Sequence, residues 1–449
     1  MTNSIHDIAV IGGGASGTLL SIQLLRRATP GLRIALIERG PSPGRGIAYA
    51  QSNGDNLLNT RPGDVTLHSD QPDHFARWLA GRADDDGKPY AAHAFVPRRL
   101  YGDYLAEQLA ADAQARPGML TLLQGEVIDI ARSTGGLTLA LADGGTLRCR
   151  LAVLATGHAP PSGRDGAFHG DPWSPDALAG LAPDERLLII GTGLTMADLA
   201  TTLDARGHRG RIVAMSRRGL LPRSHPALPP AGAHHDMPEA FTRGELSARL
   251  KAFRRMVRGG ESWSGLMHAT RAHNAELWHE LSEAQRRRFL RHLRPWWDVH
   301  RHRLPPQVAE RIAGLREAGR LEIRRGRIAE ITPAPDHVDV AWSAPGTAEI
   351  TCERFDRVID CRGPRTDPDS GARLARALRD SGLAGVDPLG LSFATDDADR
   401  VSGPAADRLF ALGPPTRGRH WEITAMPDIR RRGTALAERL LGLLAADER

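Results

Sequence analysis

The chain opens with an apolar run that breaks into glycines and continues as an amphipathic segment. Residues 8–11 are apolar, glycines follow, and an amphipathic pattern runs on to Arg27. This order predicts a strand, a phosphate-binding turn and a helix. We expect Gly12 to make the tight turn, Gly14 to leave room for a pyrophosphate, and Gly17 to let the helix pack closely on the strand. The free N–H groups at the start of the helix would then face the anion.

A second apolar strand follows and ends in an acid. Residues 33–38 form this run, and Glu38 closes it about 20 residues after the turn, the spacing expected of a dinucleotide-binding unit. A carboxylate at this point accepts hydrogen bonds from ribose hydroxyls and repels a 2′-phosphate. The first unit therefore suits FAD or NAD. A glycine-rich turn in an unrelated α/β protein is the alternative, and it does not explain the acid.

The same pattern recurs near the middle of the chain. Residues 187–190 are apolar, Gly191 and Gly193 follow, and the next strand, 211–216, ends in Ser216-Arg217-Arg218. A hydroxyl and two guanidinium groups suit the 2′-phosphate of NADPH. Met196 stands at the third glycine position, which weakens this second fingerprint. A solvated arginine pair is the alternative reading of residues 217 and 218.

Short alternating runs follow each unit and predict two antiparallel meanders. The first meander comprises residues 120–124, 127–131, 137–142 and 147–150 and feeds a separate strand at 151–155; the second comprises 328–332, 338–342 and 350–353. Glycines and prolines at 40–49 predict an irregular loop that lies over a ligand or a partner domain. Further helices are predicted at 73–79, 96–114 and 429–446.

These elements predict an α/β fold with two Rossmann-like dinucleotide-binding domains, each with a β-meander, and a mainly helical insertion. The FAD-binding domain is expected to be discontinuous. The predicted bounds are 1–185 and 355–449 for the FAD domain, 186–225 and 305–354 for the NAD(P)H domain, and 226–304 for the insertion.

Composition narrows the class of protein further. The 449 residues are 41% hydrophobic and 25% charged, as in ordinary globular proteins, and the net charge of +6 comes almost wholly from arginine. Nothing resembles a nucleic-acid-reading module, so we expect no nucleic-acid partner. No apolar run approaches the roughly 20 residues that span a bilayer, and the first strand starts too early for a signal peptide. With three dispersed cysteines, this predicts a cytoplasmic protein without a membrane partner or a redox dithiol.

The chain resembles the bacterial FAD/NAD(P)-binding proteins of the YdhS type, distant relatives of flavin-containing monooxygenases and ornithine or lysine N-hydroxylases. The resemblance covers nearly the whole length and rests on the sequences at 12–17, 44–49, 95–102, 155–158, 191–195, 216–222, 289–293, 297–303 and 421–425. It implies two cofactors, FAD and NADPH. Beside the residues named above, it implies cofactor contacts from Ser16, Arg45, Thr156, Gly157, Thr195 and Gly413. Such proteins commonly carry Thr where this chain has Arg362, which would contact a phosphate or close a salt bridge.

The kinship implies that NADPH reduces FAD and that a flavin C4a-hydroperoxide hydroxylates a small amine or sulfur nucleophile. Asn59 is the candidate beside the reactive flavin edge; a local turn cap is its alternative role. A reductase or electron carrier acting with a partner protein, and a nucleotide-binding module without turnover, stay open, as does the oligomeric state. The clusters 234–236 and 300–302 lack the helical i, i+4 histidine pair of many metal sites, so no metal is predicted. The insertion, rich in arginine at 286–294, is expected to cover the site, to recognise an acidic substrate, or simply to be solvated.

Overall fold

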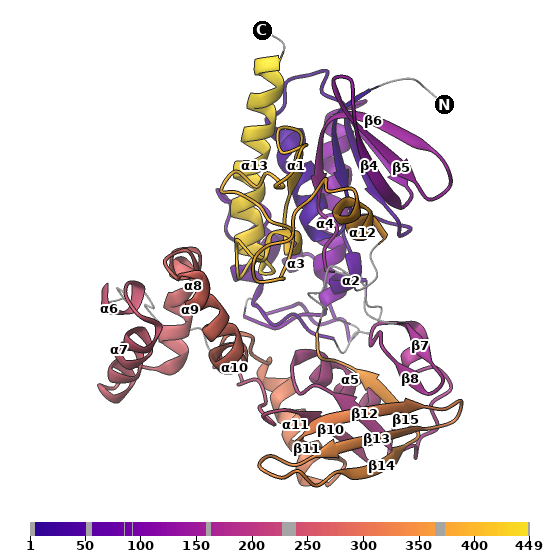
Figure 1. Ribbon diagram of the computed structural model, residues 1–449, viewed down its shortest axis with the longest axis vertical. Helices are drawn as coiled ribbons and strands as arrows, with labels where there is room; N and C mark the ends of the chain where they lie inside the picture. Colours follow the sequence, from indigo (N-terminus) through magenta and orange to yellow (C-terminus); the bar gives the residue numbers. More distant parts are fainter. Residues whose placement is uncertain are drawn as a thin grey trace. The chain divides into compact units, whose positions relative to one another are not determined.

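The computed structural model describes residues 5–50, 56–84, 86–91, 93–158, 163–226, 239–363 and 373–447. It divides the chain into two compact units. Unit 1 consists of Met1–Ser52, Thr60–Ala159 and Arg365–Arg449, and unit 2 of Asn53–Asn59 and Pro160–Pro364. Each unit is built around a mainly parallel sheet (Figure 1).

The sheet of unit 1 has the strand order β3-β2-β1-β6-β5-β4, with β16 pairing β6. Strands β1, β2, β3, β6 and β16 run parallel where they pair, whereas β4, β5 and β6 pair antiparallel. The strands are β1 (His6–Ile11), β2 (Ile34–Glu38), β3 (Leu120–Gln124), β4 (Val127–Ser133), β5 (Gly136–Leu141), β6 (Thr146–Leu154) and β16 (Leu409–Ala411).

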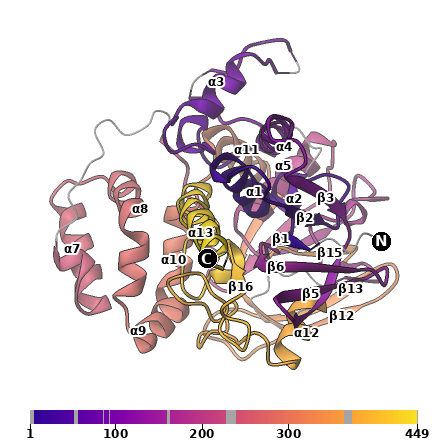
Figure 2. The same cartoon turned by 90° about the horizontal axis from the view of Figure 1, so that it is seen from above.

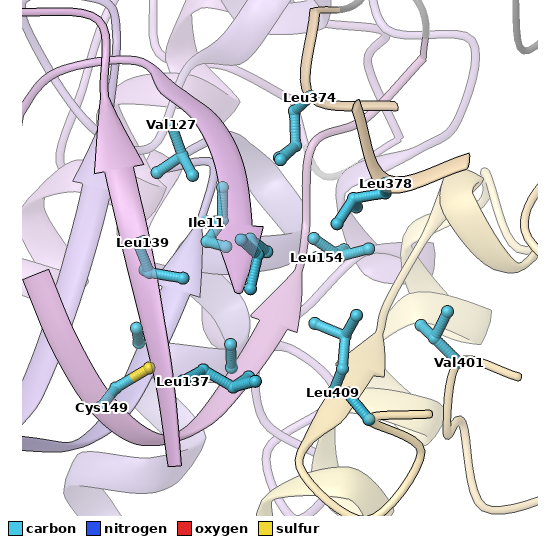
Figure 3. Packing of buried hydrophobic residues seen from close by; sticks show 14 of the residues in the cluster. Ile11, Val127, Leu137, Leu139, Cys149, Leu154, Leu374, Leu378, Val401 and Leu409 are labelled. Atoms are coloured by element: carbon cyan, nitrogen blue, oxygen red, sulfur yellow. The ribbon is translucent and has the colours of Figure 1, made fainter. Parts of the chain in front are cut away.

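Helices cover this sheet because alternate strand residues point to opposite faces. On one face α1 packs between α4 and α13, an arrangement visible in both views (Figures 1 and 2). On the other face, Ile11 and Leu154 meet Leu374 and Leu378 of α12 and residues of the meander in one buried cluster (Figure 3). The helices of unit 1 are α1 (Ala15–Arg27), α2 (Gly46–Tyr49), α3 (His74–Ala80), α4 (Arg98–Ala115), α12 (Arg373–Asp380) and α13 (Met426–Asp447), with 3₁₀ turns at Pro62–Asp64 and Pro414–Thr416.

Unit 2 has three layers. Its sheet has the order β11-β10-β9-β15-β8-β7, and a separate meander has the order β12-β13-β14. Helices α5 and α11 pack on one sheet face through Leu203 and Ile312, and the meander covers the other face through Val340 and Phe355. The elements are β7 (Arg164–Asp165), β8 (Phe168–His169), a 3₁₀ turn at Pro175–Ala177, β9 (Leu187–Ile190), α5 (Leu194–Ala205), β10 (Ile212–Ser216), α11 (Pro306–Glu317), β11 (Leu321–Arg325), β12 (Arg327–Pro333), β13 (Val338–Ser343), β14 (Thr351–Phe355) and β15 (Arg357–Asp360).

A helical insertion leaves the sheet after β10 and returns before α11. Its ends meet at a parallel bridge between Ser224 and Leu304. Its own small core contains Phe241, Phe253 and Leu266. The helices are α6 (Glu239–Thr242), α7 (Leu246–Arg258), α8 (Trp263–His279), α9 (Glu283–Arg288), a π-helical turn at Phe289–Leu293 and α10 (Arg294–Arg301). Pro295 accounts for the π turn, because its ring and missing N–H disfavour a regular α-helix at that point.

The structure confirms the predicted α/β class and corrects four local expectations. Residues 120–124 form β3, a parallel edge strand next to β2, and do not join the meander. The runs at 147–150 and 151–155 form one strand, β6, because its first half pairs with β5 and its second half with β1. The loop at 40–49, predicted to be irregular, contains the short helix α2. Finally, β15 pairs with β9 and β8, so residues 163–185 and 355–363 lie in unit 2 and not in the FAD domain.

Candidate cofactor sites

The first glycine turn is as tight as the sequence predicts. Gly12 has φ +104°, and a Cβ there would lie 2.5 Å from the carbonyl oxygen of Ala155. A Cβ on Gly17 would overlap the carbonyl oxygen of Gly12, so any side chain would push α1 off the strand. Gly14 is different, because its nearest neighbour would be the Cα of Gly46 at 3.6 Å. Among the described residues, a Cβ on Gly14 would therefore make one ordinary van der Waals contact, and the turn has room for a small group at this point.

The N-terminus of α1 is prepared for an anion. Gly14 is its N-cap, provides no side-chain cap, and no acid stands in the first turn. The first N–H groups of a helix have no partner within the helix, and their partial positive charge favours a phosphate. The space and the free donors fit the pyrophosphate of a dinucleotide.

Glu38, which we predict to bind the adenosine ribose, lies beside this turn. One carboxylate oxygen accepts from the N–H of Gly13 at 2.6 Å and the other from the N–H of Gly40 at 2.8 Å. These two bonds hold the carboxylate in place, and each oxygen keeps a lone pair for a ribose hydroxyl. Glu38 is thus oriented before any ligand binds.

The other predicted FAD contacts converge on the same helix end. A Cβ on Gly413, which has φ +79°, would overlap the hydroxyl oxygen of Ser16. The Cα of Thr156 would lie 3.1 Å from a Cβ on Gly12, and Gly157 follows with φ +70°. β16 and β6 run parallel, so their carboxyl ends deliver Gly413 and Thr156 to one edge of the sheet.

The loop before α2 also contributes to this site. The N–H of Gly44 donates to the carbonyl oxygen of Gly13 at 2.7 Å, and Gly46 lies against Gly14. Arg45 is the one residue of this loop that we predicted to contact a cofactor, and its guanidinium forms an exposed ion pair with Asp103 at 2.6 Å. The two flanking glycines were the available signal, since a close approach of two backbones needs residues without a Cβ.

Unit 2 repeats the turn with different side chains. Gly191 has φ +117°, and a Cβ there would lie 2.5 Å from the carbonyl oxygen of Cys361. Gly193 is the uncapped N-cap of α5, a Cβ on it would have no atom within 4 Å, and Thr195 lies half-buried in the first turn. Met196 replaces the third glycine and is fully buried in the core beneath α5. The turn and the helix start therefore fit a second dinucleotide.

The strand end of unit 2 that we predict to bind the ribose is basic. Arg217 and Arg218 are exposed and form no ion pair with any residue that the structure describes. Ser216 forms a hydrogen bond with Thr192 at 2.9 Å, an interaction that the sequence did not indicate. Arg362 closes the salt bridge expected as one of its two roles, to Asp360 at 2.6 Å.

Asn59 lies in the short piece of chain that crosses into unit 2. Its carbonyl oxygen accepts from Nε2 of His225 at 2.9 Å, and nearby Leu57 packs on the α5 core. These contacts fix the backbone at Asn59 and just before it. The role of its amide beside a flavin stays a prediction.

The insertion carries the positive charge of the chain. Residues 239–302 contain 13 of the 59 basic residues and 7 of the 53 acidic ones, so the rest of the chain is neutral, with 46 of each. Arg286 donates to backbone carbonyls, Arg287 pairs with Glu283, and Arg294 pairs with Asp298. Recognition of an acidic substrate by this lobe stays a prediction.

The structure describes one of the two histidine clusters, 300–302, and not the other. His300 stacks on Trp263 with ring centroids 4.6 Å apart, whereas residues 234–236 lie outside the described part of the chain. Within that part, no group of three or more His, Cys, Asp or Glu side chains could hold a metal ion. Nor does any described helix combine the length and the apolar character needed to cross a bilayer.

Residues 9–159 match the model of a family described as FAD-NAD(P)-binding. A search of curated proteins found no match. Solved structures do match over almost the whole chain. A cadaverine monooxygenase of Erwinia amylovora, bound to FAD, has a TM-score of 0.66 and 13% identity over 98% of this chain and 95% of its own. The ornithine N-hydroxylase of Kutzneria sp. 744, with reduced FAD, NADP⁺ and L-ornithine, has a TM-score of 0.63 and 14% identity over 97% of this chain and 99% of its own. Lactococcus lactis thioredoxin reductase has a TM-score of 0.53 and 14% identity over 98% of this chain and 99% of its own.

These findings define the class of protein. The fold is that of two-domain flavoproteins, and the N-terminal region is an FAD/NAD(P)-binding domain. The predicted fold and the prediction of FAD/NAD(P) binding are confirmed.

Proposed function

We propose that the chain is an FAD-dependent oxidoreductase that takes hydride from NADPH and hydroxylates a small amine. The observation that carries the proposal is the difference between two glycine turns of the same build. The first ends in the preoriented carboxylate of Glu38, and the second in Ser216-Arg217-Arg218. An acid favours the free ribose hydroxyls of FAD, and arginines favour the 2′-phosphate of NADPH.

The residues of each turn have separate tasks. In unit 1, the N–H groups at the start of α1 would bind the FAD pyrophosphate and Glu38 the ribose, with Ser16, Thr156 and Gly413 lining the same helix end. In unit 2, Gly193 and Thr195 would face the NADPH pyrophosphate. A bound flavin would supply the hydride acceptor and the activation of dioxygen. The protein then has to bind, orient and exclude water, and it needs no side-chain nucleophile.

The amine class rests on the named structural relatives, a cadaverine monooxygenase and an ornithine N-hydroxylase. A sulfur nucleophile is the second member of the class. The likeness to thioredoxin reductase suggests disulfide reduction as an alternative. The positions of the three cysteine thiols argue against this reaction. The three cysteines form no disulfide, and only Cys352 is exposed. Burial raises the pKa of Cys149 to about 12 and that of Cys361 well above its usual value. Reduction of a disulfide by a dithiol needs a second accessible thiol beside the reactive thiolate, and these buried cysteines do not supply one.

The test is NADPH consumption by the FAD-loaded protein in air, with a panel of amines and thioethers. We expect one substrate to accelerate NADPH oxidation and to appear as a hydroxylated product in proportion to the NADPH consumed. If every substrate yields only hydrogen peroxide, and an added protein acceptor is reduced at the expense of NADPH, the protein is a reductase and not a monooxygenase. No oxidation of NADPH at all would leave a nucleotide-binding module.

A further inference from the structure

The hydroxyl group of Ser216 is already committed within the protein. The hydroxyl of Thr192 donates to the carbonyl oxygen of Leu220 at 2.6 Å, since a carbonyl can only accept. The 2.9 Å hydrogen bond between Thr192 and Ser216 must therefore use the hydrogen of Ser216. Ser216 Oγ also accepts from the N–H of Gly219 at 3.0 Å. Ser216 thus has no hydrogen to donate to a phosphate while this network stands.

Unit 2 has no acid at the end of β10. The equivalent pair in unit 1 is Gly13 and Glu38, whose carboxylate accepts from the N–H of Gly13. In unit 2 the pair is Thr192 and Ser216, which are joined through their hydroxyl groups. This pair offers no carboxylate to the 2′-hydroxyl of NADH.

A third arginine, Arg325, has its backbone beside the turn that follows β10. Arg325 is the last residue of β11 and the register partner of Ser216 in the parallel ladder. The N–H of Gly326 donates to the carbonyl oxygen of Ser216 at 3.0 Å, and a Cβ on Gly219 would lie 3.2 Å from the Cβ of Arg325. The ends of two neighbouring strands thereby bring Arg325 to the turn that carries Arg217 and Arg218.

Arg325 differs from its neighbour Arg324 in charge compensation. Arg324 pairs with Glu322 at 2.8 Å and with Glu353 at 2.5 Å. Arg325 is exposed and has no ion-pair partner in the described part of the chain. Three guanidinium groups without counter-ions at one turn create a local positive potential that attracts an anion.

We propose that Arg325 is a third ligand of the 2′-phosphate of NADPH, beside Arg217 and Arg218. This inference rests on the assignment of NADPH to unit 2. It replaces the hydroxyl of Ser216, expected from the sequence to meet the phosphate, by a guanidinium group from another strand.

The test is calorimetric titration of the FAD-loaded protein with 2′,5′-ADP and with 5′-AMP, which differ only in the 2′-phosphate. Arg325→Ala is expected to weaken 2′,5′-ADP binding about tenfold or more, as for other charge-assisted contacts, and to leave 5′-AMP binding unchanged. Arg206→Ala is the matched control. It removes an exposed arginine at the far end of α5, about 18 Å along a helix of 12 residues, and should change neither affinity.

The outcomes separate the two claims. If Arg325→Ala binds 2′,5′-ADP like the wild type while Arg217→Ala binds it more weakly, the third ligand is wrong and the NADPH assignment stands. If the wild type does not prefer 2′,5′-ADP to 5′-AMP, the NADPH assignment fails, and this inference fails with it.

Discussion

Gly14→Ala separates cofactor binding from folding in unit 1. Gly14 has φ −68° and ψ −169°, which alanine adopts without strain, and its new Cβ would meet only the Cα of Gly46 at 3.6 Å. Replacing glycine by alanine at a compatible position raises the free energy of unfolding by about 0.4–1 kcal/mol, because it restricts the unfolded chain. The apoprotein should therefore be as stable as the wild type or slightly more so.

The same methyl group occupies the space proposed for the FAD pyrophosphate. Overpacking by one such group costs about 1–3 kcal/mol, which corresponds to about 5–150-fold weaker binding of FAD. Gly193→Ala is the counterpart in unit 2, with no atom within 4 Å of the new Cβ, and should weaken NADPH instead. Gly17→Ala is the structural control, because its Cβ would overlap the carbonyl oxygen of Gly12 and should lower Tm.

The assay is Tm of each apoprotein together with fluorescence titration by FAD. Unchanged FAD affinity in Gly14→Ala would show that the pyrophosphate does not lie against this residue. A large fall in Tm of the Gly14→Ala apoprotein would refute the claim that the site beside it is open.

Three further predictions concern Glu38 and His68 of unit 1 and Asn59 of the segment 53–59. Glu38→Gln should weaken FAD about tenfold or more, because an amide can accept only one of the two backbone N–H bonds and turns a donor toward the other; FAD titration measures it. Burial, and then the charge of Arg26, lower the pKa of His68 from 6.5 to about 4. The unfolded chain therefore binds more protons between those pH values, and the free energy of unfolding should fall by up to about 3 kcal/mol as the pH drops from 6.5 to 4. His68→Gln, which can still accept from Arg26, should flatten this dependence in urea unfolding; an unchanged slope would contradict it. Asn59→Ala should keep its FAD but release more hydrogen peroxide per NADPH, and unchanged coupling would remove Asn59 from the site.

Local structure could be predicted from the sequence wherever steric constraints allow only one type of residue. Gly12 and Gly17 stand where any Cβ would collide with backbone, so their spacing predicted both the turn and the packing of α1. The identity of the residue that ends each second strand predicts an acidic and a basic ribose site, and this assignment stays a prediction. Helices with a clear amphipathic period, such as α13, were also predictable.

The rest depended on pairing between distant segments, which a hydrophobic pattern does not encode. β3 and β6 have the alternation of meander strands, and only their pairing with β2 and β1 makes them part of the parallel sheet. β15 belongs to unit 2 because it pairs with β9. Arg325 gave no signal at all, since its proximity to Ser216 arises from the register of β10 and β11.

The central claim is that hydride passes from NADPH held by unit 2 to FAD held by unit 1. The most direct measurement is anaerobic mixing of the FAD-loaded protein with NADPH while the visible absorption of oxidised flavin is followed. We expect NADPH to bleach this absorption and NADH to do so much more slowly. An absorption that NADPH leaves unchanged, or that NADH bleaches equally fast, would contradict the account.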